Sequence, residues 1–274
     1  MDDGQLIDLE PFFLEGGQGP LFCIRLGPRQ SVPLARVLYL HPFAEEMNKS
    51  RRMAALQARQ LAAQGYEILQ VDLTGCGDSW GDFSDATWQG WQADGMRAAD
   101  WLTQREPSLP LVLWGLRLGA SLAVEVGEAR SDVSGLLLWQ PVTNGDLFLG
   151  QFLRLKQVSD MLGDRASRAS VQSCRAQLLE GQPVEVAGYL LSPELALGIA
   201  TVRLETANPR EVVWIELTSP ASPASLETID QWQARGCNVE LVCIHSEPFW
   251  STQEISICPS LIEKTSAIVE RLTG

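Results

Sequence analysis

The chain of 274 residues is 45% hydrophobic and carries a formal net charge of −13, so it can bury a large core beneath an acidic surface. An acidic surface repels phosphate backbones and anionic membrane surfaces, which argues against nucleic acid as a partner. No apolar run approaches the roughly 18 residues of a membrane span, and the acidic first residues do not match a signal peptide, so we expect a cytoplasmic protein without a membrane span.

Cysteine and histidine are too sparse and too scattered for the common metal sites. The chain has six cysteines and two histidines, and no two cysteines form a C-x-x-C pair. We interpret the cysteines as reduced, mostly structural thiols. A zinc site of the usual kinds has few ligands to be built from, and we expect neither a metal nor another cofactor.

The first half of the chain predicts strands that alternate with helices. Apolar runs at residues 6–14 and 21–26, joined by a glycine-rich turn, predict an antiparallel hairpin at a sheet edge. A strand over 36–41, a helix that ends near residue 64 and a strand over 66–72 predict a right-handed parallel crossover. The pattern continues with a helix that carries a tryptophan stripe (88–102), a strand and helix (110–129) and a strand over 134–140.

The strand pattern stops between residues 145 and 203, where the spacing of apolar residues becomes helical. Three helices are expected there, at 148–162, 168–179 and 193–202, with a break at Gly181-Gln182-Pro183. Strands and helices then resume at 211–217, 224–235, 238–244 and 259–272. This pattern predicts an α/β fold with a mostly parallel sheet, whose core comprises 1–144 and 204–274 and whose inserted helical cap comprises 145–203.

The stretch from Pro110 to Ala123 predicts a buried strand, a turn between two glycines and a helix of small residues. Gly115 and Gly119 flank Arg117 with the spacing of a Gly-x-Ser-x-Gly nucleophile elbow, in which a strained turn lifts the middle side chain above the sheet. The same spacing also occurs in an ordinary tight turn between strand and helix. Because arginine stays protonated, it cannot be the attacking atom of acyl transfer, and the elbow lacks its nucleophile.

Three loops together resemble the α/β-hydrolase superfamily over essentially the whole chain. They are the His41-Pro42-Phe43 loop, similar to a His-Gly-x oxyanion loop, the loop from Asp72 to Ser79, similar to Asp-x-x-Gly-x-Gly-x-Ser, and the elbow. Four segments further resemble the exosortase A system-associated hydrolase 2 family: His41 to Arg51, Trp114 to Gly119, Leu138 to Val142, and Glu247 to Trp250. This resemblance implies the α/β-hydrolase fold, ester or thioester hydrolysis, and a bacterial protein encoded near the machinery for PEP-CTERM sorting and exopolysaccharide export.

The sequence departs from the superfamily at each position of its catalytic triad. The superfamily places the acid after a late strand and the histidine after the last strand. Here the loop after Leu217 has no carboxylate, and Pro248-Phe249 stands where the family has His-Phe. His245, at the end of the last strand, is a weak catalytic candidate, because Arg117 gives it no nucleophile to deprotonate. The alternative for His245 is a strand-end histidine bonded to backbone, and His41 is expected to shape its loop.

A nucleophile from outside the elbow is a further possibility. Cys76 and Ser79 lie in a loop at the appropriate edge of the sheet, but neither occupies a strained turn. Ser121, on the helix after the elbow, is expected to face the packed interior. An active ester or thioester hydrolase with such a non-standard nucleophile is therefore the second hypothesis.

The anion-stabilising half of a hydrolase site is retained, and it carries the leading hypothesis. The backbone N–H groups of Phe43 and Leu118 are expected to point at one spot near a helix N-terminus, where Arg117 adds a positive charge. Such a pocket holds a carboxylate or phosphate. The expected pocket residues are His41, Trp114, Trp139, Pro248, Phe249 and Trp250. We therefore expect a protein with a degenerate triad that binds an anionic or acyl-bearing small molecule.

A third hypothesis is a non-catalytic interaction protein with a vestigial pocket. In that case Arg117 forms an internal ion pair, and the candidate partners are Glu45, Glu46, Asp72 and Asp78. The two binding hypotheses differ in whether the guanidinium faces a cavity or is held by a carboxylate.

Overall fold

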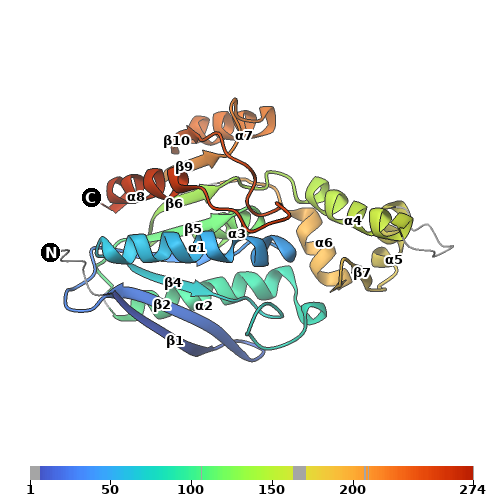
Figure 1. Ribbon diagram of the computed structural model, residues 1–274, viewed down its shortest axis with the longest axis horizontal. Coiled ribbons are helices and arrows are strands. Elements are labelled where there is room, and N and C mark those ends of the chain that lie inside the picture. The colour runs from blue at the N-terminus through green and yellow to red at the C-terminus, as the bar shows by residue number, and fades with distance from the viewer. Residues whose placement is uncertain (1–6, 106, 163–170, 207, 209, 274) are drawn as a thin grey trace.

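The computed structural model describes residues 7–105, 107–162, 171–206, 208 and 210–273, and it contains one large sheet (Figure 1). Eight strands lie in the order β1-β2-β4-β3-β5-β6-β9-β10. From β4 to β10 neighbouring strands are parallel, while β1 and β2 form the predicted antiparallel hairpin at one edge. The strands are β1 (Ile7–Glu15), β2 (Pro20–Pro28), β3 (Arg36–Leu40), β4 (Glu67–Val71), β5 (Leu111–Leu116), β6 (Val133–Trp139), β9 (Glu211–Glu216) and β10 (Asn238–Cys243).

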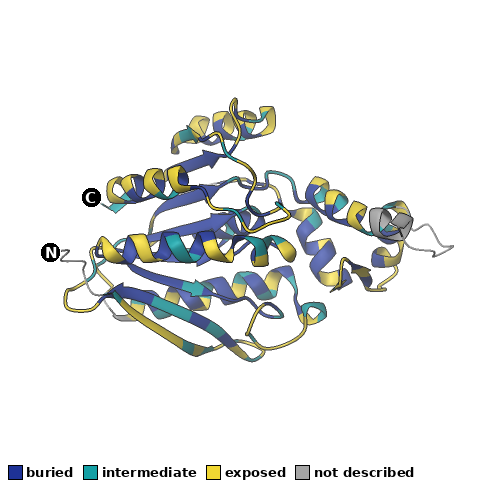
Figure 2. Ribbon diagram, viewed as in Figure 1, coloured by how far each residue is buried: buried dark blue, intermediate teal, exposed yellow. Residues whose placement is uncertain are grey.

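Helices cover both faces of the sheet, which confirms the predicted α/β-hydrolase fold. Alternate side chains of a strand point to opposite faces, so Leu38 and Leu40 belong to one hydrophobic core and Val37 and Tyr39 to the other. The first core packs under α2 (Trp88–Arg105), α3 (Leu118–Glu128) and α7 (Pro223–Ala234), and the second under α1 (Glu45–Ala63) and α8 (Pro259–Thr273). Figure 2 shows the central strands buried, β1 at the sheet edge largely exposed, and the outer helix faces exposed. Among the described helices, none is long and apolar enough to cross a membrane.

The segment after β6 leaves the sheet and forms a separate group of elements at one end of the molecule (Figure 1). It contains α4 (Gly145–Leu162), α5 (Val171–Leu179), the hairpin β7 (Val184–Val186) and β8 (Tyr189–Leu191), and α6 (Pro193–Thr201). Sequence analysis missed this hairpin, because each of its strands has only three residues, and β7 directly follows the expected helix break at 181–183. Residues 168–170 of the expected second helix lie outside the described ranges.

The two ends of this insertion meet in space. Asn144 and Arg203 form an isolated antiparallel bridge. Beside it, the N–H of Gly145 donates to the carbonyl of Val202 at 3.0 Å, an ordinary backbone hydrogen-bond length. The expected cap, 145–203, begins and ends at this bridge. Its independence as a domain remains a prediction.

A short 3-10 helix, η1 (Phe83–Asp85), lies in the loop before α2 and contacts β8.

Candidate functional site

The turn between β5 and α3 has the backbone of a nucleophile elbow with Arg117 at its apex. Arg117 has φ 56° and ψ −122°, a conformation that costs a non-glycine residue free energy, and α3 begins at the next residue. A Cβ atom on Gly115 would collide with Ala120, and one on Gly119 would collide with the carbonyl oxygens of Leu40 and His41. The glycine spacing therefore exists because α3 starts in contact with the ends of two strands.

The side chain of Arg117 forms an ion pair with Glu46 from the first turn of α1. Arg117 Nε lies 3.2 Å from Glu46 Oε1, and the two side chains are 18% and 21% exposed. The guanidinium carbon also lies 5.3 Å from the ring centre of Trp250 and 5.7 Å from that of Phe148, within the range of cation–π contacts. Of the four candidate partners, the structure therefore places Glu46 against Arg117.

This ion pair lines a cavity of about 340 Å³ between the elbow, α1, α4 and the loop after β10. The wall is largely aromatic and aliphatic, and its charged members besides the pair are Glu45 and Lys49. Glu45 accepts a hydrogen bond from the Tyr189 hydroxyl, and Lys49 Nζ donates to the carbonyl of Gln253. The lining residues are Phe43, Ala44, Glu45, Glu46, Lys49, Arg117, Phe148, Gln151, Phe152, Leu155, Trp250 and Ser251.

Burial makes Glu46 an unusual carboxyl group. Burial raises its pKa, and the nearby Arg117 charge opposes that rise without cancelling it. Its second oxygen, Oε2, is buried and has no hydrogen-bond partner among the described residues. An ionised carboxylate in such a place is costly unless paired, and Arg117 is the cation that stabilises the ionised form of Glu46.

The predicted oxyanion loop lies at the same cavity. Phe43 lines the wall, where its ring packs edge-on against Phe148 and Phe152 of α4 at centroid distances of 5.7 and 4.9 Å. Leu118 begins α3 directly after Arg117, with its side chain buried in the core. Their backbone positions thus flank Arg117 from two helix starts, while their role as anion donors remains a prediction.

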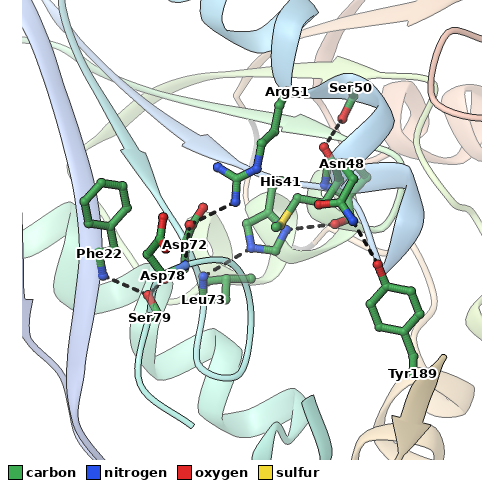
Figure 3. Close-up of polar contacts among 12 residues, drawn as sticks. Phe22, His41, Asn48, Ser50, Arg51, Asp72, Leu73, Asp78, Ser79 and Tyr189 are labelled. Atoms are coloured by element: carbon green, nitrogen blue, oxygen red, sulfur yellow. Dashed lines mark hydrogen bonds and ion pairs between the residues drawn. The ribbon is translucent and has the colours of Figure 1, made fainter. Parts of the chain in front are cut away.

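His41 does not line this cavity. Both of its ring nitrogens bond to backbone. Nε2 accepts from the N–H of Leu73 at 3.2 Å, so Nδ1 carries the proton and donates to the Pro42 carbonyl at 2.8 Å (Figure 3). Burial lowers the pKa of His41, although Asp72 raises it. A neutral histidine held in this way fixes the path of its loop. It borders a separate cavity of about 210 Å³, where Arg51 pairs with Asp72 at 3.0 Å.

The candidate nucleophiles of the loop after β4 are engaged in local structure. Ser79 Oγ donates to the carbonyl of Asp72 and accepts from the N–H of Phe22 (Figure 3). Cys76 is buried, and burial together with Asp72 raises the pKa of its thiol, which disfavours the reactive thiolate. Ser121 Oγ donates to the Val142 carbonyl inside the core.

The remaining predicted pocket residues are divided between the cavity and the core. Trp250 lines the cavity, whereas Trp114, Trp139 and Phe249 are buried on the sheet face beneath α1 and α8. Alternation along β5 and β6 points these two strand tryptophans to that face, where their rings lie 4.7 Å apart. Pro248 and His245 are exposed and absent from the wall of this cavity.

Sequence analysis missed a buried carboxylate at the end of β9. Glu216 precedes Leu217 and accepts hydrogen bonds from Trp214 Nε1 at 2.8 Å and from Gln140 Nε2 at 2.6 Å. Gln140 also accepts from the N–H of Leu217 at 2.7 Å, so these side chains join the ends of β6 and β9. The sequence signal for this carboxylate is a charged residue, Glu216, at the end of an otherwise apolar strand.

Part of the chain matches a known protein family and the sequences of several known proteins. The family model Hydrolase_4, described as serine aminopeptidase, S33, matches residues 31–207. Human protein ABHD12B is 30% identical over 112 residues, which cover 39% of this chain and 30% of that protein. The lysophosphatidylserine lipase ABHD12 of Xenopus tropicalis is 30% identical over 112 residues, covering 39% of this chain and 28% of its own length. The aligned stretch is thus less than a third of either relative.

Solved structures share the fold at low sequence identity. Est1E from Butyrivibrio proteoclasticus superposes with a TM-score of 0.65 at 11% identity, covering 96% of this chain and 98% of Est1E. A Xanthomonas campestris serine hydrolase described as having no lid gives a TM-score of 0.60 at 16% identity, covering 97% and 95%. Since the family model covers more than half of the sequence, the chain belongs to the Hydrolase_4 (serine aminopeptidase, S33) family of the α/β-hydrolase superfamily.

Proposed function

We propose that this protein has a degenerate triad and binds an amphipathic anion, a carboxylate or phosphate on an apolar or aromatic body, in the cavity beside Arg117. The observation that carries the proposal is the position of Arg117. It occupies the apex of the elbow and lines a largely apolar cavity, and its ion pair with Glu46 uses Nε alone. A guanidinium has five N–H donors in a planar fork, so the two terminal amino groups remain for a ligand.

The chemistry of the wall supports a ligand with a charged head and an apolar body. The head fits the outer edge of the guanidinium, where two parallel hydrogen bonds are possible. The body fits among Phe148, Phe152, Leu155 and Trp250. The starts of α1 and α3 add the positive ends of two helix dipoles on the same side.

The names of similar proteins agree with this ligand class. One relative is named a lysophosphatidylserine lipase, and a structure of Est1E contains ferulic acid, an aromatic carboxylic acid. Straight-chain and aromatic carboxylates are therefore the first compounds to test.

The test is titration calorimetry with decanoate and ferulate, using decanol as an uncharged analogue. We expect wild type to bind the carboxylates, and Arg117→Gln to bind decanoate at least tenfold more weakly while its affinity for decanol changes little. Arg271→Gln is the matched control, because the Arg271 side chain is 62% exposed, pairs with Glu240 and does not line the cavity. Equal decanoate affinity in wild type and Arg117→Gln would remove Arg117 from the site.

The ion pair with Glu46 favours one alternative, a non-catalytic interaction protein with a vestigial pocket. A guanidinium that already has a carboxylate partner needs no ligand for charge balance. The same titrations separate the two proposals, since this alternative expects no binding of any of the three compounds. An active ester or thioester hydrolase would need Cys76, Ser79 or His245, and the surroundings of the first two disfavour it.

The biological setting is proposed from the resemblance of this sequence to the exosortase A system-associated hydrolase 2 family. The segments His41 to Arg51 and Trp114 to Gly119 support it. We place the protein in the cytoplasm of a bacterium, at the exopolysaccharide and PEP-CTERM sorting locus. Native mass spectrometry of protein purified from such a bacterium is the test: a co-purified acyl or phosphate compound lost in Arg117→Gln supports this placement, and an empty wild-type protein contradicts it.

A further inference from the structure

Glu46 is the carboxylate with which a bound anion must share Arg117. Its contact with Arg117 is a single one, at 3.2 Å, through Nε and Oε1. Its other oxygen is buried and receives no hydrogen bond from the described residues. A carboxylate held by one contact in an apolar wall loses its stabilisation as soon as the guanidinium is shared with a second anion.

The other charged groups at the cavity do not replace Arg117 as the partner of Glu46. On its own helix, Glu45 is bonded to Asn48 and Tyr189, and Lys49 donates to the Gln253 carbonyl. The cavity-lining residues of α4 and of the loop after β10 are uncharged: Phe148, Gln151, Phe152, Leu155, Trp250 and Ser251. Within the described part of the chain, Arg117 is therefore the only cation that forms an ion pair with Glu46.

We propose that the cavity takes up a monocarboxylic acid as its anion together with one proton, with the anion on Arg117 and the proton on Glu46. This inference rests on the proposed function and deepens it. In the free protein the pair Glu46⁻/Arg117⁺ is neutral. Binding of R–COO⁻ and H⁺ gives R–COO⁻/Arg117⁺ with neutral Glu46, so no bond other than O–H is formed and the cavity remains neutral.

The physical reason is that one guanidinium cannot neutralise two carboxylates in an aromatic cavity. Like charges that share a site raise the pKa of one member, and burial already raises the pKa of Glu46 in the free protein. Between the pKa of Glu46 in the free protein and its higher value in the complex, each binding event takes up one proton. In that range the apparent Kd increases about tenfold for each unit of pH.

The same balance selects the charge of the ligand. A monocarboxylate needs one proton to keep the cavity neutral, and Glu46 can accept it. A dianion needs two protons, and Glu46 can accept only one of them. Decanoate should therefore bind at least tenfold more tightly than decanedioate, whose second carboxylate would enter the aromatic end of the cavity.

The experiment is calorimetric titration of the full chain with decanoate at pH 7.5 in triethanolamine and in Tris, two amine buffers whose heats of ionisation differ. We expect uptake of up to one proton per decanoate in wild type, and an apparent Kd that increases as the pH is raised from 6 to 8.5. Glu46→Gln should bind decanoate without proton uptake and with a Kd that is independent of pH, because an amide does not titrate in this range. The amide oxygen can still accept a hydrogen bond from Arg117 Nε, so the contact itself is kept. Glu227→Gln, the same substitution at an exposed residue of α7 that does not line the cavity, should retain the uptake.

The outcomes separate this inference from the proposed function. Binding that depends on Arg117 but takes up no proton in wild type overturns the inference and leaves the proposed function intact. Uptake that persists in Glu46→Gln also overturns it, whereas failure of decanoate to bind at all overturns both. If Glu46→Gln does not fold, infrared difference spectra of wild type with ¹³C-labelled decanoate decide the matter: a protonated protein carboxyl must appear on binding, and its absence refutes the inference.

Discussion

Ala44 and Arg117 share nearly the same backbone conformation, with φ 51° and ψ −127° in one and φ 56° and ψ −122° in the other, and each immediately precedes a helix. Both residues line the same cavity. The chain therefore begins α1 and α3 with two similar strained turns at the carboxyl edge of the sheet, and the N-terminal ends of both helices meet one pocket. This pairing supports the proposal that the cavity binds an anion, because two helix N-termini add positive potential to an ion pair that is neutral overall.

Replacement of Arg117 by alanine should destabilise the protein in a pH-dependent way. The change leaves Glu46 without its cation, so its folded-state pKa rises further above the ordinary value of 4.5. A carboxyl group with a higher pKa in the folded state binds more protons there, and stability falls as the pH rises from 4.5 through the raised value. We expect a loss of about 2 kcal/mol at pH 8, less than for a fully buried pair because both side chains are partly exposed, and a smaller loss at pH 5.

Urea denaturation of wild type, Arg117→Ala and the double variant Arg117→Ala/Glu46→Gln checks this. The double variant should recover most of the stability at pH 8, since it leaves no unpaired charge. A loss in Arg117→Ala that is the same at pH 5 and pH 8 would show that packing, rather than the charge of Glu46, is responsible.

Short p-nitrophenyl esters should be hydrolysed no faster by this protein than by an inert control protein. Arg117 supplies no attacking atom, and Ser79 and Cys76 are held in their local structure. Arg117→Ser should remain inactive, because Pro248-Phe249 stands at the expected histidine position and an unassisted serine is a weak nucleophile. Release of p-nitrophenol is measured by absorbance. Activity that co-purifies with the protein and disappears in Cys76→Ala or Ser79→Ala would establish a working hydrolase.

Gly119→Ala should severely destabilise the fold. The added methyl would overlap the carbonyl oxygens of Leu40 and His41, which are backbone atoms that cannot move without displacing β3. We expect a loss of more than about 3 kcal/mol, or no soluble protein. Gly150→Ala, inside α4, is the control: its methyl would meet only the end of the Arg175 side chain, and it should be neutral or slightly stabilising. Equal melting temperatures for the two variants would contradict the proposed close approach of α3.

Removal of residues 145–203 should produce an aggregating protein. Asn144 and Arg203 are paired, so the two ends can be joined by a short linker. The deletion takes away Phe148 and Phe152, which cover Phe43, and an uncovered aromatic patch promotes association. Size-exclusion chromatography measures the outcome. A shortened protein that is monomeric and melts near the wild-type temperature would show that the segment does not act as a cap.

The sequence by itself determined the α/β-hydrolase fold and the position of the elbow. Alternating strands and helices have distinct periodicities, and the spacing of Gly115 and Gly119 is a short sequence pattern typical of the turn between a buried strand and a helix. The hairpin β7–β8 was missed, since its three-residue strands carry too little periodic signal.

Only the tertiary structure decided what faces Arg117. Four carboxylates were equally eligible from the sequence, and Glu46 is the partner because α1 begins immediately after Ala44 and turns its first residues toward the elbow. Strand-end aromatics were expected in the pocket, but the side to which β5 and β6 point Trp114 and Trp139 depends on strand register. Besides the expected Phe43 and Trp250, the cavity wall includes residues of α4, whose docking on Phe43 is set by packing between distant parts of the chain.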